Sequence, residues 1–596
     1  MAAITQERRS GLMGVERSLR GRRWELRSQD DRSALALSQS LGLPEIVGRV
    51  LTGRGVALEE AEGFLAPTLR DLLPDPASLK GAEAAAQRIA EALEAGEGIA
   101  VFGDYDVDGA TSSALLLRYF RALGSGALVH IPDRITEGYG PNAPALIGLK
   151  ERGAKLAITV DCGITSFEPL AAAADAGLEV IVVDHHKAEP KLPEAVAVVN
   201  PNRLDDESGQ GHLAAVGVTF LLLVALNRCL RARGYFNETR KEPDLRQWLD
   251  IVALGTVCDV VPLRGLNRGF VTQGLKILAQ RRNPGLQALS DVAGIDERPG
   301  TYHLGFLLGP RVNAGGRVGK SDLGVRLLTS DDPGEARALA EQLDAFNLER
   351  REIEAAVLDE AIAAVEAGPA PEGLVFAAGR GWHPGVIGIV ASRLKERYDL
   401  PALVVALDEQ GLGKGSGRSV RGVDLGASVI AARQADLLVN GGGHAMAAGI
   451  TVAEEKLDEL RAFLAGRLGQ QMAELDYQPA MGFDGLLQPG AATSELVRLL
   501  EQVGPFGTDN PEPRFLLPGV KVAQAQVVGE NHVRCRLIGP DGRGLKAIAF
   551  KALDSALGQG LLTGGGRAFH VAGKLRPDNW SGRDAVQFIV EDAAEA

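Results

Sequence analysis

Residues 99–109 have the sequence IAVFGDYDVDG, and this stretch decides the fold. Four apolar residues and a glycine, typical of a buried strand, are followed by three carboxylates at alternate positions: Asp104, Asp106 and Asp108. Three acids within five residues repel one another, and a carboxylate removed from water must be paired or bound to metal. The stretch therefore predicts a divalent-metal site at the carboxyl end of a strand.

The segments that follow alternate between strand-like and helix-like patterns. Strands are predicted at 99–103, 127–131, 156–160, 180–183 and 196–199, and helices at 110–123, 143–152 and 167–176. This alternation predicts an α/β fold with a doubly wound parallel sheet and helices on both faces. Ligands of such sheets bind beyond the carboxyl ends of the strands.

Further acids and histidines come after the later apolar runs. Asp161 follows 156–160, Asp184-His185-His186 follows 180–183, and Asp259 follows the run 255–258. A single acid after a strand is usually a helix cap or turn residue, but four coinciding clusters favour a site. Oxygen and imidazole donors suit Mn²⁺ or Mg²⁺ better than zinc. Because five or six donors exceed the needs of one ion, we expect two divalent cations roughly 3.5 to 4 Å apart, activating a water for attack at phosphorus.

Length and composition limit the class of protein. The 596 residues suffice for three or four domains. The four cysteines are far apart, which argues against disulfides or a zinc knuckle and favours a cytoplasmic location. No run approaches the roughly 18 uninterrupted apolar residues of a membrane span, so no membrane association is predicted. A net charge of −13 does not exclude nucleic acid, because screening over roughly 8 to 10 Å isolates a basic groove from an acidic exterior.

Five units are predicted along the chain. Residues 1–45 are expected to be a flexible N-terminal arm, 46–332 the sheet domain with N-terminal helices, 333–368 a connecting helix, 369–470 a second, smaller α/β domain, and 471–596 a C-terminal OB-like β-barrel. Aromatic and basic residues of the barrel segment offer stacking surfaces and phosphate partners: His532, Arg534, Arg536, Lys546, Phe550, Lys574, Arg576 and Trp580. Ordinary barrel strands alternate as well, so DNA binding by these side chains and plain packing both stay open.

The carboxylate and histidine set resembles that of the DHH phosphoesterases. The motifs that carry the likeness are DYDVDG at 104–109, Asp161, DHH at 184–186 and VCD at 257–259. Later motifs are similar to those of the single-strand-specific 5′→3′ exonucleases of this family: GPRVNAGGR at 309–317, GWHPGVIGIVASR at 381–393, GSGRS at 415–419, GGGHAMAAG at 441–449 and GPFGTDNPEP at 504–513. The likeness runs from about residue 45 to the end of the chain.

This resemblance implies roles for individual residues. The metal-binding positions are Asp104, Asp106, Asp108, Asp161, His185 and Asp259, and the catalytic positions are Asp161 and His186. His186 would lie near the scissile phosphate, where it stabilises charge or assists proton transfer. Asp184 would orient a neighbouring group, with helix or turn capping as an equal alternative. The sheet domain and the second domain would enclose the substrate between them.

The resemblance also implies a pocket for a 5′ phosphate. Residues 413–418 are expected to form a glycine-rich loop whose donors suit a phosphate, although a surface turn has a similar sequence. The residues assigned to substrate binding are Arg134, Ser416 and Arg418 in the pocket, Arg311, Asn313 and Arg317 on the DNA backbone near the metals, and His444 at the scissile region. Trp382 and His383 are left out, since a packed tryptophan beside a satisfied histidine explains them equally well.

The leading prediction is a metal-dependent exodeoxyribonuclease specific for single-stranded DNA. It would start at the 5′ end and release 5′-mononucleotides in DNA repair and recombination, served by a helicase and a single-strand-binding protein. One alternative is a DHH phosphodiesterase of short oligonucleotides or cyclic dinucleotides, although such substrates do not need the extra domain after 470. The other is a non-catalytic single-strand-binding protein, although clustered acids repel phosphate.

Overall fold

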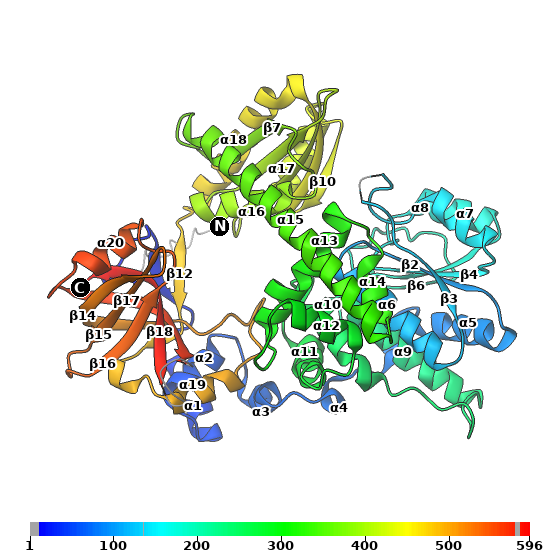
Figure 1. Cartoon of the computed structure of the whole chain (residues 1–596), viewed down its shortest axis with the longest axis horizontal. Coiled ribbons are helices and arrows are strands. Elements are labelled where there is room, and N and C mark those ends of the chain that lie inside the picture. The colour runs from blue at the N-terminus through cyan, green and yellow to red at the C-terminus, as the bar shows by residue number, and fades with distance from the viewer. Residues whose placement is uncertain (1–10, 135, 579–584) are drawn as a thin grey trace, which may run out of the picture.

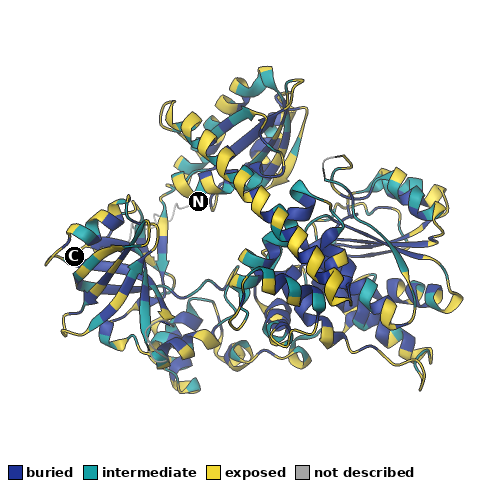
Figure 2. Cartoon of the chain, viewed as in Figure 1, coloured by how far each residue is buried: buried dark blue, intermediate teal, exposed yellow. Residues whose placement is uncertain are grey.

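The computed structural model describes residues 11–134, 136–578 and 585–596. Three units surround a central opening: a sheet domain, a second α/β domain and a β-barrel (Figure 1). Helix α15 (Pro333–Glu366) joins the first two units. Each unit has its own buried core (Figure 2), and the predicted fold class is confirmed.

The sheet domain is built on five parallel strands in the order β3-β2-β4-β5-β6. The strands are β2 (Ile99–Gly103), β3 (Ala127–His130), β4 (Leu156–Val160), β5 (Glu179–Val183) and β6 (Ala197–Val199). One face packs against α5 (Ala82–Ala95), α6 (Val107–Ala122) and α9 (Ala215–Ala232), and the other against α7 (Ala143–Glu151) and α8 (Phe167–Asp175). Successive residues of β2 alternate between these two cores, as the two-residue period of a strand requires, so the sheet is doubly wound as predicted.

Helix α9 is apolar enough to be a candidate membrane span, which the sequence analysis did not notice. Among the described residues it is the one helix that is long and apolar enough to cross a membrane. However, 72% of this window is buried inside the protein, and Phe220 packs edge-on against Phe270 with ring centroids 5.0 Å apart. A core helix of a large globular domain is apolar all round for the same reason.

Six further helical segments extend the sheet domain beyond the carboxyl edge of its strands. They are α10 (Leu249–Cys258), α11 (Gly265–Leu278), α12 (Pro284–Val292), the π-helical η5 (His303–Leu308), α13 (Gly309–Val318) and α14 (Leu323–Thr329). Their apolar faces share one hydrophobic core with α6 and α9.

The second domain has a five-stranded sheet in the order β10-β11-β9-β8-β7. Its strands are β7 (Val375–Arg380), β8 (Ala402–Leu407), β9 (Leu412–Arg418), β10 (Asn440–His444) and β11 (Ala447–Ala453), with helices α16 (Ile387–Tyr398), α17 (Leu425–Gln434) and α18 (Leu457–Glu474). The glycine-rich loop predicted at 413–418 is wrong, because these residues form strand β9 in the interior of the sheet. His444 is the last residue of strand β10.

Packing explains the glycines of β9. A Cβ atom at Gly413 would lie 2.6 Å from Val405, one at Gly415 2.5 Å from Ile450, and one at Gly417 2.7 Å from Leu425. Alternate residues of a strand point to opposite faces, so Lys414, Ser416 and Arg418 all project from the other face. The motif is therefore a strand with a tightly packed glycine face and a polar face.

The C-terminal unit is a closed barrel of five strands in the order β14-β15-β16-β18-β17, with β17 pairing back to β14. The strands are β14 (Phe515–Val528), β15 (His532–Ile538), β16 (Gly544–Ala549), β17 (Ala568–Pro577) and β18 (Val586–Glu595). Strand β18 was not anticipated from the sequence. The OB-like barrel is confirmed, and Trp580 lies outside the described residues.

Residues 11–61 belong to the barrel unit, and the predicted flexible arm is wrong for residues 11–45. Strand β1 (Arg23–Leu26) pairs in parallel with β12 (Ala480–Phe483). Helices α1 (Asp31–Leu41) and α2 (Glu45–Thr52) share a core with the barrel, where Leu37 and Leu51 join Phe515. Residues 46–61 thus differ from the expected N-terminal helices of the sheet domain, because their apolar faces are covered by the barrel. Residues 1–10 lie outside the described part of the chain.

Candidate active site

The three alternating carboxylates mark the passage from β2 into α6. Asp104 follows the strand directly, and Asp106 caps the helix by accepting hydrogen bonds from Asp108 N (2.9 Å) and Gly109 N (3.0 Å). Helix α6 therefore begins at Val107, three residues earlier than predicted. A Cβ atom at Gly109 would lie 2.4 Å from the Asp104 carbonyl oxygen, so only glycine lets the helix approach the strand this closely.

Asp108 lies on the first turn of α6 and is 1% exposed. Its two carboxylate oxygens accept hydrogen bonds from Ala215 N (2.6 Å) and Val216 N (2.9 Å) at the start of α9. Burial and the charge of Asp106 raise the pKa of Asp108 to about 7. The amino terminus of α9 thus fixes this carboxylate and offsets part of its burial cost.

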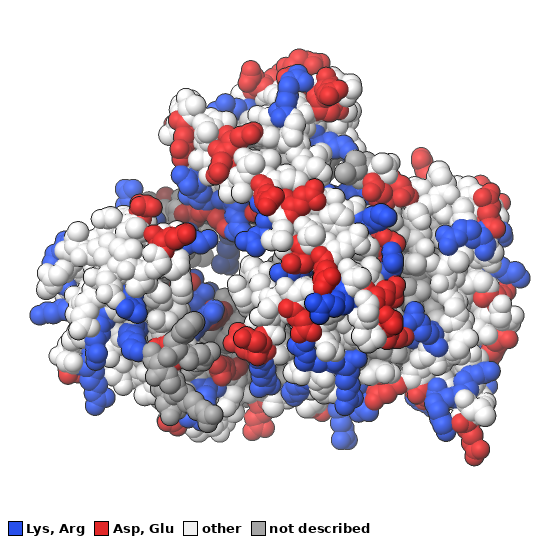
Figure 3. All heavy atoms as spheres, viewed as in Figure 1, with Lys and Arg blue, Asp and Glu red and all other residues white. Residues whose placement is uncertain are grey.

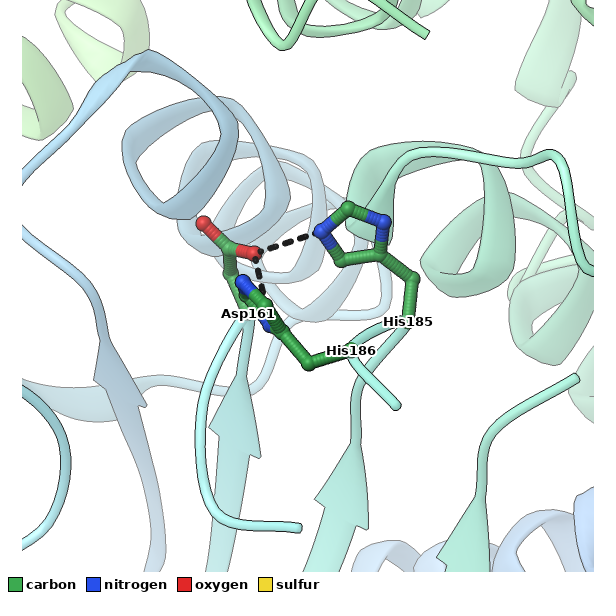
Figure 4. A group of neighbouring side chains, drawn as sticks. All are labelled: Asp161, His185 and His186. Carbon is green, nitrogen blue, oxygen red and sulfur yellow. Dashed lines mark ion pairs between the residues drawn. The ribbon is translucent and has the colours of Figure 1, made fainter. Parts of the chain in front are cut away.

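Asp161 directly follows strand β4 in a left-handed backbone conformation, with φ of 62°, and is 3% exposed. Figure 4 shows its carboxylate facing both histidines, with Oδ1 3.3 Å from His185 Nε2 and 3.9 Å from His186 Nδ1. Burial and the nearby carboxylates, Asp106 first among them, raise the pKa of Asp161 well above its ordinary range. This acid is therefore costly to ionise in the absence of a cation.

His185 has the orientation of a metal ligand. Its Nδ1 donates to the Leu213 carbonyl oxygen (3.1 Å), which leaves Nε2 without the proton and directed at Asp161. Burial lowers the pKa of His185 to about 4, so the imidazole is neutral at neutral pH. A neutral imidazole is the form that binds metal.

Asp184 orients the neighbouring backbone and His186. It accepts hydrogen bonds from Ile164 N (3.0 Å), His185 N (2.7 Å) and His186 N (3.1 Å), and His186 Nδ1 lies 2.8 Å from its Oδ1. Burial would raise the pKa of Asp184, but the hydrogen bonds and charge of His186 lower it. In return Asp184 raises the pKa of His186 against the opposing effect of burial.

Asp259 reaches the cluster from a helix. The sequence analysis placed Asp259 after an apolar run at 255–258, whereas this run is the last part of helix α10 and Asp259 is the C-cap of that helix. Every residue of α10 up to Thr256 is buried, so apolar and polar residues do not alternate with the period of either a helix or a strand. The sequence pattern therefore could not distinguish the two. Asp259 Oδ2 lies 3.7 Å from His185 Nδ1.

The acids and histidines form three overlapping groups, within each of which the donor atoms lie within 4.8 Å of one another. The groups are Asp104/Asp106/Asp161, Asp161/His185/His186 and Asp108/His185/Asp259. In the described part of the chain, four buried atoms of this cluster have no hydrogen-bond partner: Asp104 Oδ1, Asp161 Oδ1, His185 Nε2 and Asp259 Oδ2. Buried polar atoms are normally paired, so converging orphan donors fit divalent cations. Oxygen and imidazole donors suit Mn²⁺ or Mg²⁺.

A cavity of about 550 Å³ lies between the sheet domain, which contributes Arg134 and Arg317, and the second domain. Its lining includes the cations Arg134, Arg317, Lys414 and Arg418 and the hydroxyl of Ser416. Gly388 of α16 approaches closely, since a Cβ atom there would lie 3.0 Å from both Ser416 Oγ and Arg418 Nη2. Burial and the charge of Arg134 lower the pKa of both Arg418 and Arg317, the latter to about 10. Guanidinium groups this close together repel one another, which disfavours their charged forms. An anion bound between them would offset this repulsion.

Arg134 connects the cavity to the cluster. Its guanidinium lies 5.1 Å from the ring centroid of Tyr105, between Asp104 and Asp106 in sequence. Its charge lowers the pKa of Arg418 and also opposes the rise in the pKa of Asp104, so it acts on both sites. Residues from two domains thus face a common space.

The remaining residues predicted to bind the substrate are Arg317 and His444, which lie near the cavity or the domain boundary, and Arg311 and Asn313, which lie on α13. Arg317 lines the cavity, where its Nη1 donates to the Gly385 carbonyl oxygen (2.8 Å). Burial and the charges of Lys187 and Arg418 lower the pKa of His444, and His186 lowers it further. Because Lys187 and His186 belong to the sheet domain, His444 lies near the boundary of the two domains. Arg311 donates a hydrogen bond from its Nε to Asp344 (2.8 Å) and one from its Nη1 to the Leu307 carbonyl oxygen (2.8 Å), and its contact with the DNA backbone stays a prediction. Asn313 lies half-buried on the same helix, α13.

Sequence analysis missed Tyr139. Its hydroxyl donates to the Asp161 carbonyl oxygen (3.1 Å) and lies 3.4 Å from His186 Nδ1. The two glycines that flank Tyr139 were the only local signal, and a turn explains them equally well. Trp382 is packed as its alternative interpretation proposed, 7% exposed with Nε1 donating to Glu360 (2.7 Å).

Comparisons with known proteins match the whole architecture. Family models match the DHH family N-terminal domain at residues 98–256, the DHHA1 domain at 371–470 and the RecJ OB domain at 483–592. The single-stranded-DNA-specific exonuclease RecJ of Salmonella typhimurium is 38% identical over 568 residues, covering 92% of this chain and 96% of that protein. Its counterpart in Bacillus subtilis is 35% identical over 575 residues, covering 96% and 71%.

Solved structures show the same similarity in three dimensions. RecJ from Thermus thermophilus in complex with Mn²⁺ matches with a TM-score of 0.78 and 31% identity, covering 95% of this chain and 78% of that one. The complex of that protein with Mg²⁺ matches with a TM-score of 0.73 over 95% and 77% of the two chains.

Proposed function

Because this chain belongs to the RecJ family of single-stranded-DNA-specific exonucleases, we propose that it degrades single-stranded DNA from the 5′ end and releases 5′-mononucleotides. The observation that carries this proposal is the position of Arg134, which joins a cluster of orphan metal donors to a cavity lined by cations. The cluster suits phosphodiester hydrolysis, and the cavity suits a terminal phosphate.

We assign two divalent cations, Mn²⁺ or Mg²⁺, to the cluster. Their ligands would be Asp104, Asp106, Asp108, Asp161, His185 and Asp259. Bound there, the cations would activate a water and neutralise charge developing at phosphorus. The chain itself contributes fixed donors, since α9 holds Asp108 and the Leu213 carbonyl orients His185.

His186 is assigned to the scissile phosphate. Its hydrogen bond to Asp184 raises its pKa, so the ring holds a proton more readily than a free imidazole. A protonated ring at this position stabilises charge on the phosphate or donates a proton to the leaving oxygen. Asp161, which faces His185 and His186 together, is the second residue assigned to catalysis.

The cavity is assigned to the 5′ phosphate. Ser416, Arg418, Arg134 and Arg317 supply hydroxyl and guanidinium donors, and a phosphate accepts several such bonds at once. Arg311, Asn313 and Arg317, all on α13, are assigned to the DNA backbone near the metals, and His444 is assigned to the scissile region. An enzyme that must anchor a terminal phosphate can begin only at that end.

The face shown in Figure 3 carries both signs of charge, and Lys and Arg side chains border the hollow between the units. This arrangement supports the entry of a polyanion into an otherwise acidic protein. We further assign the protein to DNA repair and recombination in the cytoplasm, with a helicase and a single-strand-binding protein as partners that deliver unpaired strands.

The test compares labelled single-stranded DNA with and without a 5′ phosphate, in Mn²⁺. Wild-type protein is expected to shorten the phosphorylated strand progressively from the 5′ end. Arg418→Ala is expected to lose about tenfold to a hundredfold of the preference for the phosphorylated strand, since a hydrogen bond to a charged group contributes roughly 1.5 to 3 kcal/mol. The matched control is Arg397→Ala, because Arg397 lies on the same domain as Arg418 and pairs with Glu366 of α15. An unchanged preference in Arg418→Ala would contradict the pocket.

The same assay separates the two alternatives. Cleavage of dinucleotides but not of longer strands would indicate a phosphodiesterase of small substrates. Tight binding without cleavage in Mn²⁺ or Mg²⁺ would indicate a single-strand-binding protein.

A further inference from the structure

Tyr302 and Phe306 form an exposed aromatic pair that the proposed reaction does not use. Their side chains are 56% and 70% exposed, and their rings are stacked with centroids 5.3 Å apart and an interplanar angle of 25°. Single exposed apolar residues are common on protein surfaces, but two neighbouring aromatic rings with aligned faces form a binding surface.

One end of the segment that carries this pair is anchored at the metal cluster. Segment η5 (His303–Leu308) runs directly into α13. A Cβ atom at Gly309 would lie 2.4 Å from Cys258 Sγ, and Cys258 directly precedes Asp259. Gly305 faces Val257 of the same helix, where its Cβ atom would lie 3.4 Å away. The segment that carries the pair therefore packs on the helix that presents Asp259.

The other side of the pair faces the barrel unit. Thr301 Oγ1 donates to the Phe506 carbonyl oxygen (2.7 Å), which ties this segment to the chain leading into the barrel. The pKa of Arg576, raised mainly by its hydrogen bonds to Glu512, is raised further by Tyr302, so Arg576 of β17 lies near the ring. The aromatic pair thus lies between the helix that presents Asp259 and a barrel strand.

We propose that Tyr302 and Phe306 are a stacking platform for the bases of single-stranded DNA between the barrel and the metal cluster. This inference rests on the proposed function. Every base has a π-face, so an aromatic platform holds a strand without regard to its sequence. Arg576, which pairs with Glu512, lies near Tyr302 as a cation for the backbone, and Lys574 is two residues away on the same strand, β17.

Substrate length distinguishes a platform from a role in catalysis. A 5′-phosphorylated dinucleotide has one nucleotide beyond the scissile bond, whereas a 5′-phosphorylated 20-mer extends past the cluster toward the barrel. The double variant Tyr302→Ala/Phe306→Ala is expected to raise the KM for the 20-mer about tenfold or more, because stacking contributes about 1 to 3 kcal/mol per base. Its kcat/KM for the dinucleotide is expected to stay within about twofold of wild type, because that substrate does not reach the platform.

Two controls make this test specific. Leu204→Ala removes an apolar side chain that is 74% exposed elsewhere on the sheet domain, and it is expected to leave both substrates unaffected. Tyr302→Trp/Phe306→Trp keeps aromatic faces and is expected to restore the wild-type KM for the 20-mer. Both residues are exposed, so melting temperatures should be unchanged.

The outcomes are distinct. A double alanine variant with the wild-type KM for the 20-mer, or with an equal loss on both substrates, would overturn the platform while leaving the exonuclease intact. Wild-type protein inactive on both substrates would instead overturn the proposed function.

Discussion

Replacing Asp161 with asparagine tests the metal cluster through stability and activity together. The donor atoms of Asp104, Asp106 and Asp161 lie within 4.8 Å of one another. Two carboxylates at that distance repel by about 3.5 kcal/mol at an effective dielectric constant near 20. Asparagine removes this repulsion, adopts a φ of 62° readily, and breaks no hydrogen bond of Oδ1, which has none in the described structure.

The raised pKa of Asp161 shows that partial protonation already relieves some of this repulsion. We therefore expect metal-free Asp161→Asn to be more stable than metal-free wild type by about 1 to 3 kcal/mol. For domains of this size each kcal/mol shifts the melting temperature by about 2 to 4 °C, so the variant should melt about 2 to 12 °C higher in EDTA.

Manganese should reverse this order. Wild-type protein gains about 2.7 kcal/mol at a Mn²⁺ concentration one hundred times Kd, whereas the variant lacks a charged donor shared by two of the three groups and gains less. Hydrolysis should fall by at least about a thousandfold, because metal-held charge stabilisation contributes several kcal/mol and each 1.36 kcal/mol is tenfold in rate.

Differential scanning fluorimetry in EDTA and in Mn²⁺ measures both effects. Asp250→Asn is the matched control, because Asp250 is a buried acid of the same domain outside the three donor groups. It should leave the Mn²⁺ shift unchanged. If Asp161→Asn melts below wild type in EDTA, or shows the full Mn²⁺ shift, the reasoning from like-charge repulsion fails.

Three further predictions follow from the same geometry. His186→Ala should lower turnover by about 10²- to 10⁴-fold yet keep the Mn²⁺ thermal shift, and loss of that shift would make His186 a metal ligand. Arg268→Ala removes the hydrogen bonds that Arg268 donates to the carbonyls of Phe64 and Gly504, so the free energy of unfolding should drop by about 2 to 5 kcal/mol and proteolysis near 503–513 should accelerate; an unchanged digestion pattern would refute this. Mn²⁺ affinity should weaken as the pH falls below about 7, because protons compete for Asp108, and equal calorimetric affinities at pH 6 and pH 8 would contradict this.

The strands of the sheet domain could be predicted because each is marked by a short, mostly apolar run of neighbouring residues. The position of the acids at the strand ends then follows from the parallel topology. Asp259 was included in the predicted site because it follows an apolar run, as the other acids follow strands. In the structure this run is the end of helix α10, which is buried on all sides. The start of α6 was misplaced because Asp106 is both a member of the cluster and the helix cap.

Strand β9 was predicted as a loop because glycine ordinarily signals a turn. Here the glycines permit close packing, and their alternation with Lys414, Ser416 and Arg418 is the two-residue period of a strand. The flexible arm predicted for the N-terminal segment is wrong for a different reason. Arg23 pairs with Ala480, and Asp592 accepts hydrogen bonds from Ser18 and Trp24, so the partners lie hundreds of residues away and leave no mark on the local pattern.

Helix α15 gives the proposed function a further consequence, which concerns product length. The first half of this helix, with Ala336 and Leu343, lies in the core of the sheet domain. The second half, with Val357 and Ala361, lies in a core shared with the second domain. At 1.5 Å per residue the 34-residue helix is a rigid connection of about 50 Å that is anchored at both ends.

The rigid helix fixes the separation between the metal cluster on the sheet domain and Ser416 and Arg418, which the second domain contributes to the cavity. If the terminal phosphate always occupies the cavity, each cut falls at the same phosphodiester bond, whatever the sequence of the strand. A uniform mononucleotide product then follows from the fold and requires no recognition of the base. Insertion of one helical turn between Leu343 and Val357 would change this separation, so loss of mononucleotide release is the expected result, whereas unaltered release would show that the two domains do not measure the product.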